Sequence, residues 1–234
     1  MSEWWTYRLS NFLLFAPRTY FRLFELYNAA IWPAQILAFA LGAGLLVLLR
    51  RGGVARGRAI AGLLAAAWLW SGVGFHALRY ATINWGAVYF AWLFGFEAAA
   101  LLGLALSRRA AFEKPADGAG RIGLGLFLFA LVVEPLIGPV LLGRRWRGIE
   151  LFAVAPDPTA VGTLGLLLLA RVRRRWLLMA APVLWAALTG VSLLAMEARD
   201  WWVAPAAAAM ALAAAGRQGS RRRVPGAAWR PAAR

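Results

Sequence analysis

Long apolar runs, separated by short segments rich in arginine, constrain this chain more than any other feature of its sequence. Most of the runs are about 17 to 22 residues long, the length that a helix needs to cross ~30 Å of hydrocarbon. The chain is 62% hydrophobic and only 15% charged, whereas a soluble domain is closer to half apolar and a quarter charged. A soluble fold would require helices that are apolar on every side, which leaves too little polar surface. The sequence therefore predicts an all-α integral membrane helical bundle.

The predicted bundle occupies residues 30–216 and contains about seven transmembrane helices. The seven apolar segments are 30–49, 59–77, 85–106, 122–142, 159–170, 176–196 and 201–216. The fifth is short, so it either extends back through residues 151–158 or forms a re-entrant segment, because non-helical backbone at membrane depth needs protein or water partners. A basic tail, residues 217–234, follows and is expected to be disordered and cytoplasmic.

Residues 1–29 mix aromatic with charged side chains and are interrupted by Pro17. In a helix, Tyr20, Phe21, Phe24 and Tyr27 would lie along one side, which predicts an amphipathic segment at the membrane interface. A loop that packs on the bundle is the alternative.

The distribution of basic residues predicts how the chain is oriented in the membrane and that this membrane is the inner (plasma) membrane. With seven spans and the N-terminus outside, most of the 26 Lys and Arg residues fall on the cytoplasmic side. Arg144, Arg145 and Arg147 are the exception. We therefore expect a multi-pass protein of the inner (plasma) membrane with a cytoplasmic C-terminus. Because the net charge of +16 is concentrated between the apolar runs, the expected partners are anionic lipid head groups and not nucleic acid. No protein partner is indicated.

The residue inventory excludes several cofactor-dependent classes of protein. The chain has no cysteine and one histidine, so thiolate metal sites and bis-histidine haem are excluded. Its one lysine, Lys114, falls in a predicted loop, so a retinal Schiff base is not expected either. We expect no cofactor and no metal, and we assign no catalytic residue.

Polar residues in and near the apolar segments are the candidate functional groups, because ionisable side chains are costly in hydrocarbon. Glu97 and Glu134 fall inside predicted spans. In the predicted topology, one set of residues from distant parts of the chain shares the outer half of the bundle and is proposed to bind a ligand: Glu25, Asn28, Gln35, His76, Arg79, Asn84, Glu134, Asp157 and Thr159. Either they line an outward-facing polar cavity, or they are hydrogen-bonded pairs that close helix ends.

Four stretches carry a family resemblance: LFELYNAAIWPAQ, WSGVGFHALRYATIN, EPLIGPVLLG and FAVAPDPTAVGTLGLLLLA. Together they resemble an uncharacterised family of bacterial multispanning membrane proteins known as domain of unknown function 6064. The resemblance covers residues 1–212 and implies a membrane protein without supplying an activity. Its pattern implies an aromatic residue where this chain has Glu134.

Three functions stay open from the sequence. The first is binding or transport of a small molecule, lipid or ion through the outward-facing cavity. The second is an accessory or scaffold subunit of a membrane complex that has no pocket. The third is a membrane enzyme that modifies lipids with Glu134 or Asp157 as a general base, which is least favoured because no nucleophile or metal set is visible.

Overall fold

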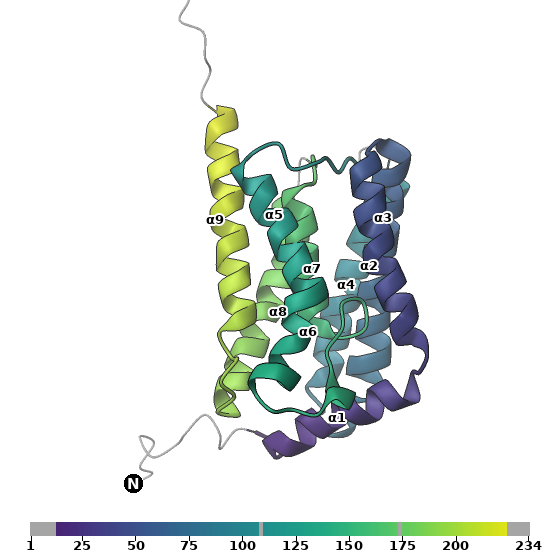
Figure 1. The fold of residues 1–234 in the computed structure, drawn as a ribbon, viewed down its shortest axis with the longest axis vertical. Helices are drawn as coiled ribbons and strands as arrows, with labels where there is room; N and C mark the ends of the chain where they lie inside the picture. The colour runs from purple at the N-terminus through teal and green to yellow at the C-terminus, as the bar shows by residue number, and fades with distance from the viewer. Residues whose placement is uncertain (1–12, 108–109, 173–174, 224–234) are drawn as a thin grey trace, which may run out of the picture.

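The computed structural model describes residues 13–107, 110–172 and 175–223, which fold into a bundle of roughly parallel and antiparallel helices (Figure 1). The main helices are α1 (Pro17–Ala30), α2 (Ala34–Arg51), α3 (Val54–Trp70), α4 (Ala87–Leu106), α5 (Gly118–Leu128), α6 (Glu134–Leu136), α7 (Pro156–Leu168), α8 (Arg175–Ala195) and α9 (Val203–Arg223). Within the described ranges there is no strand, only one isolated bridge between Phe112 and Ala170. The all-α prediction is confirmed.

Several of these helices continue through irregular turns. A π-helical segment, Ser71–Ala77, follows α3, and two more, Phe129–Val133 and Ile137–Leu141, lie on either side of α6. Single 3₁₀ turns occur at Tyr80–Thr82 and Trp146–Gly148. Counted with these extensions, five helical segments are long and apolar enough to cross a membrane: Ala34–Arg51, Val54–Thr82, Ala87–Leu106, Gly118–Leu141 and Arg175–Ala195. They correspond to five of the seven predicted segments, and the total of seven stays a prediction.

The fifth predicted segment, 159–170, falls mostly in the short helix α7, and the residues before that helix, 151–155, form a buried, non-helical stretch. Residues 151–155 are all buried, and Tyr27 Oη donates a hydrogen bond to the Val154 carbonyl at 3.1 Å. α7 then begins inside the bundle and runs to the opposite end (Figure 1). There the Glu113 N–H donates to the Leu169 carbonyl, at 3.0 Å, and the Arg171 N–H donates to the Ala111 carbonyl, at 2.8 Å. Residues 151–170 thus reach from one end of the bundle to the other.

Thr159 holds the start of α7. Its Oγ1 donates to the Ala155 carbonyl at 2.6 Å and accepts a hydrogen bond from the Ala153 N–H at 2.9 Å. Ala153 has a φ of 68°, a conformation that is rare for a residue with a side chain. Buried backbone groups cost free energy when they are left without partners. The Thr159 hydroxyl satisfies two of them where the chain changes from extended to helical.

We expect Thr159→Val, which keeps the side-chain shape, to lower the free energy of unfolding by about 1–3 kcal/mol, because a buried donor and a buried acceptor lose their partner. Denaturant titration of the purified protein in detergent measures this effect. Thr159→Ser keeps the hydroxyl and is the control. Equal losses in the two variants would show that the hydroxyl does not stabilise this turn.

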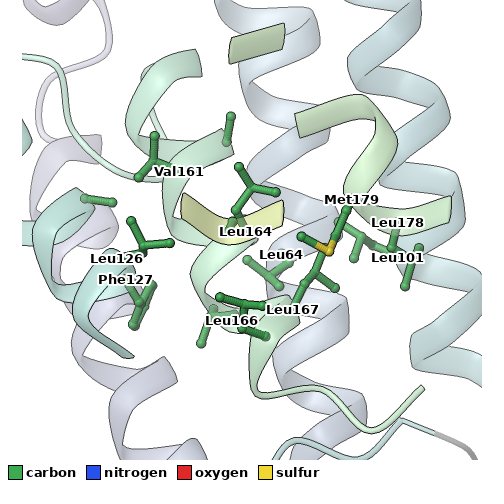
Figure 2. Packing of buried hydrophobic residues seen from close by; sticks show 14 of the residues in the cluster. Leu64, Leu101, Leu126, Phe127, Val161, Leu164, Leu166, Leu167, Leu178 and Met179 are labelled. Atoms are coloured by element: carbon green, nitrogen blue, oxygen red, sulfur yellow. The ribbon is translucent and has the colours of Figure 1, made fainter. Parts of the chain in front are cut away.

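α7 is at the centre of the hydrophobic core (Figure 2). Apart from Asp157, Thr159 and Thr163, its side chains are apolar all round the helix, as those of a surrounded helix are. Figure 2 shows them packed among side chains of α3, α4, α5 and α8. The contacting residues include Leu64, Leu101, Leu126, Phe127, Val161, Leu164, Leu167 and Met179. α5 and α7 approach closely where two glycines meet, since a Cβ on Gly123 would lie 2.5 Å from the Gly165 carbonyl oxygen.

α1 lies across one end of the bundle (Figure 1). Its aromatic side faces inward, with Phe24 stacked on Phe75 at 4.6 Å between ring centroids and Tyr20 against Tyr80 at 5.3 Å. The predicted amphipathic helix therefore forms and packs on the bundle, and its location at a membrane interface stays a prediction. Residues 1–12 of the predicted interfacial segment and 224–234 of the predicted tail lie outside the described residues, while residues 217–223 of that tail continue α9 as helix.

Candidate functional site

The helix that follows α5 is irregular on both sides of Glu134. The two π-helical segments are separated here by the single turn Glu134–Leu136. Pro135 and Pro139 each lack a backbone N–H, so the regular helical hydrogen bonding is interrupted. Such π-helical turns are frequent at functional sites. Glu134 itself is half-buried, and its Oε2 is shielded from solvent with no hydrogen-bond partner among the described residues.

Glu134 lines a small cavity with three other carboxyl groups, those of Glu150, Asp157 and Asp200. The cavity has a volume of about 40 Å³, and Tyr20 of α1 forms part of its lining. Since a water molecule needs roughly 10–15 Å³ of such space, only a few water-sized groups fit. We call this space the acidic cavity. It gathers side chains from α1, the α5–α7 connection, α7 and the segment before α9.

Arg144 also lines the acidic cavity, but its charge is already paired. Its guanidinium forms a bidentate salt bridge with Asp200, at 2.8 and 2.6 Å, and lies over the Phe21 ring at 3.9 Å from the centroid. The two side chains of the ion pair retain only 20% and 14% of their exposure. Glu134, Glu150 and Asp157 therefore form no salt bridge with this arginine in the described part of the chain, although its positive charge partly offsets the rise in the pKa of Glu150.

The three remaining carboxyl groups are in different states of hydrogen bonding. Asp157 accepts hydrogen bonds from Trp185 Nε1 at 2.7 Å and from Thr189 Oγ1 at 3.0 Å, which suits an ionised carboxylate. Burial raises the pKa of Glu150 above its ordinary value, and the negative charge of Asp157 raises it further. Carboxyl groups that share a small buried space do not all ionise without a proton or another cation between them.

A separate groove of about 420 Å³ lies beside Trp32 and Trp146. It is lined by three residues that the sequence grouped with Glu134: Glu25, Asn28 and Gln35. Asn28 Nδ2 donates to the carbonyls of residues 147 and 149, at 2.9 and 2.8 Å, and Gln35 Nε2 donates to the Asn28 carbonyl at 2.7 Å. Glu25 is paired with Arg22, and Arg145 lies 3.7 Å from it. These contacts attach α1 to the loop that follows α5.

His76 is fully buried among aromatic rings. Its ring centroid lies 4.6 Å from that of Phe94 and 4.7 Å from that of Trp185, and neither ring nitrogen has a partner within the described part of the chain. Because the same Trp185 donates to Asp157, the indole separates the histidine from the acidic cavity. His76 therefore does not line the cavity, although the two lie close together.

The remaining predicted site residues do not line the acidic cavity. Arg79 is partly exposed in the turn after the π-helical segment, and Asn84 Oδ1 accepts a hydrogen bond from the Gly86 N–H at 3.0 Å, just before α4. Glu97 is 3% exposed on α4, does not line the acidic cavity, and has one buried oxygen without a partner in the described ranges. Thr159 serves the turn before α7.

Sequence reasoning missed four residues of the acidic cavity: Tyr20, Arg144, Glu150 and Asp200. One signal was available, because Arg144 belongs to the arginine group that opposes the charge rule, and an arginine at that end of a bundle needs an acidic partner.

Among the residues that the structure describes, no group of three or more His, Cys, Asp or Glu residues could hold a metal ion.

An all-α bundle with five helical segments long and apolar enough to cross a membrane, and with half-buried carboxyl groups gathered near one end, is compatible with a membrane protein. The chain belongs to the family of unknown function DUF6064, whose model matches residues 18–224. The resemblance to this uncharacterised family is thereby confirmed, while the bacterial origin and the number of membrane spans stay predictions. No match was found among curated proteins or among solved structures.

Proposed function

We propose that the protein binds a small cationic group in the acidic cavity, as the recognition step of binding or transport at the outer side of the plasma membrane. One observation carries the proposal. Glu134, Glu150 and Asp157 face the same enclosed space, and Arg144, the sole cation among the described lining residues, is held by Asp200.

Electrostatics favours a cation over an anion or a neutral solute here. Several carboxyl groups in a partly desolvated space repel one another more strongly than they would in water. A positive group relieves this repulsion, and protons do so when no other cation is present. The volume of about 40 Å³ fits an ammonium group, whereas a tetramethylammonium ion is too large for the cavity as it stands.

The backbone around the cavity supports a role in binding or transport. α7 begins inside the bundle after a non-helical stretch, and the helix that carries Glu134 is broken by π-helical turns and prolines. Discontinuous helices at membrane depth are characteristic of substrate sites in transporters, and this parallel is an analogy between architectures. The proposal includes the seven-span topology with the N-terminus outside, which places the cavity on the outer side.

Methylammonium chloride is expected to raise the melting temperature of the purified protein in detergent at pH 8, whereas tetramethylammonium and sodium acetate at equal ionic strength are expected to raise it less. Glu134→Gln and Asp157→Asn should each weaken methylammonium binding at least tenfold, because each removes a carboxyl group that can balance the ammonium charge. Affinity should also fall from pH 8.5 to pH 6, because protons compete for a carboxyl group whose pKa is raised, that of Glu150.

Glu97→Gln is the matched control, since Glu97 is a buried carboxyl group that does not line the cavity. Methylammonium binding that is equally weakened in Glu97→Gln and Glu134→Gln would contradict the proposal. So would an equal response to methylammonium and tetramethylammonium.

A further inference from the structure

A second hollow lies directly beside the acidic cavity. One side is formed by α5 and its π-helical continuation, and the other side is formed by α9 and the residues just before it. It has a volume of about 360 Å³ and an almost wholly apolar lining. Its walls include Leu126, Phe129, Val133, Trp202, Ala206 and Met210. Val133, Trp202 and Met210 are about half exposed, so the hollow is open at the outer surface of the bundle. We call it the lateral groove.

The lateral groove and the acidic cavity share a wall. Ile137, Asp200 and Val203 line both. Ile137 belongs to the π-helical segment that follows Glu134, so the same irregular stretch of helix forms one side of each space. Asp200 is the residue that binds Arg144. A ligand in the groove therefore reaches the carboxyl groups by passing the side chains of Ile137 and Val203 and the ion pair between Arg144 and Asp200.

We propose that the ligand is an amphiphile with a primary ammonium head, which lies with its chain in the lateral groove and its head in the acidic cavity. This inference rests on the proposed function and names its substrate class. The two spaces are complementary to the two parts of such a molecule. A primary ammonium has three N–H donors for three carboxyl groups, and a hydrocarbon chain needs no polar partner in an apolar groove.

The position of the groove also indicates how the amphiphile would enter, which is sideways from the lipid bilayer. α5 and α9 lie side by side at one edge of the bundle (Figure 1), and several groove residues between them are exposed on the surface that contacts lipid tails in a membrane protein. A chain that is already in the bilayer gains little free energy from another apolar surface. The head group therefore supplies the selectivity, and the groove admits the molecule sideways. Arg199 also lines the groove and would offer a positive charge to a phosphate joined to the ammonium.

Photolabelling tests this assignment on the full chain in lipid nanodiscs. The probe is dodecylammonium with a diazirine at mid-chain, and the reference probe is dodecanoate with the same diazirine. We expect at least tenfold more labelling by the ammonium probe in the peptides of 126–142 and 199–210. Ala206→Phe, which fills the groove from its exposed side, should abolish most of this labelling. Ala209→Phe, an exposed alanine on the same helix outside the groove, should not change it.

Competition identifies the source of the ligand. Protection by lysophosphatidylethanolamine and by dodecylammonium assigns the site to membrane lipids, and protection by dodecylammonium alone assigns it to soluble alkylamines. Equal labelling by the carboxylate probe, equal labelling in Ala206→Phe and Ala209→Phe, or protection by neither competitor would overturn the inference. The proposed function is tested separately by methylammonium binding to the wild-type protein. If methylammonium binds and the groove is not labelled, only the substrate class is wrong.

Discussion

Gly123→Ala is expected to lower the free energy of unfolding by about 3 kcal/mol, the upper end of the usual cost of overpacking a core. The new Cβ would lie 2.5 Å from the Gly165 carbonyl oxygen and 2.8 Å from Leu168 Cβ. A side-chain rotation cannot relieve a collision with backbone, so α5 and α7 must move apart. The reciprocal change, Gly165→Ala, meets the Gly123 carbonyl at 2.5 Å and should cost a similar amount. Denaturant titration in detergent measures both.

Gly125→Ala is the control for this prediction. It lies one residue beyond Leu124 on the same helix, and a Cβ there would have nothing within 4 Å. Because alanine is the better helix former, this change should be neutral or should stabilise by up to ~1 kcal/mol. Equal stability of the alanine variants at 123 and 125 would show that α5 and α7 do not approach as closely as described. Separation of these helices should also weaken methylammonium binding, because Asp157 begins α7 and Glu134 follows α5.

Arg144→Met is expected to destabilise the protein by about 3 kcal/mol, because removal of one partner leaves a largely buried charge, that of Asp200, without compensation. Asp200→Leu should cost a comparable amount by leaving the guanidinium unpaired. The double variant should lose less than the sum of the two single losses, since neither charge is left behind. The coupling free energy obtained from this cycle is expected to be about 1–3 kcal/mol. Strictly additive losses would mean that the ion pair does not contribute as a unit.

The limits of the spans could be predicted from the sequence because hydrophobicity and helix length are local properties. The predicted segments 30–49, 85–106 and 176–196 differ by only a few residues from the helices Ala34–Arg51, Ala87–Leu106 and Arg175–Ala195. The fifth segment stands out in the sequence because residues 159–170 are too few to span a bilayer. The π-helical turns were not predictable, because they depend on how neighbouring helices pack and not on a residue pattern.

The candidate site was harder to predict, because a topology gives the depth of a residue but not its direction around the helix axis. The predicted topology puts Glu134, His76 and Gln35 at one depth. In the structure they lie in the acidic cavity, in an aromatic cage and in a groove between α1 and α2. Direction is set by tertiary packing, and the Trp185 indole between His76 and Asp157 could not be foreseen from spacing. The acidic partners Glu150 and Asp200 lie in connections between helices, where charged residues ordinarily face water.

The short helix α7 has a consequence for how the chain is assembled in a membrane. An isolated segment of this length, which starts with Pro156-Asp157-Pro158 and follows a non-helical stretch, is a poor substrate for independent insertion, since its free backbone groups would meet hydrocarbon. Its partners are Tyr27 from α1, Trp68 from α3 and Trp185 from α8. The last of these is synthesised after α7. We therefore expect residues 151–170 to complete their insertion only after α8 has been synthesised, because Trp185 of α8 supplies a partner for Asp157.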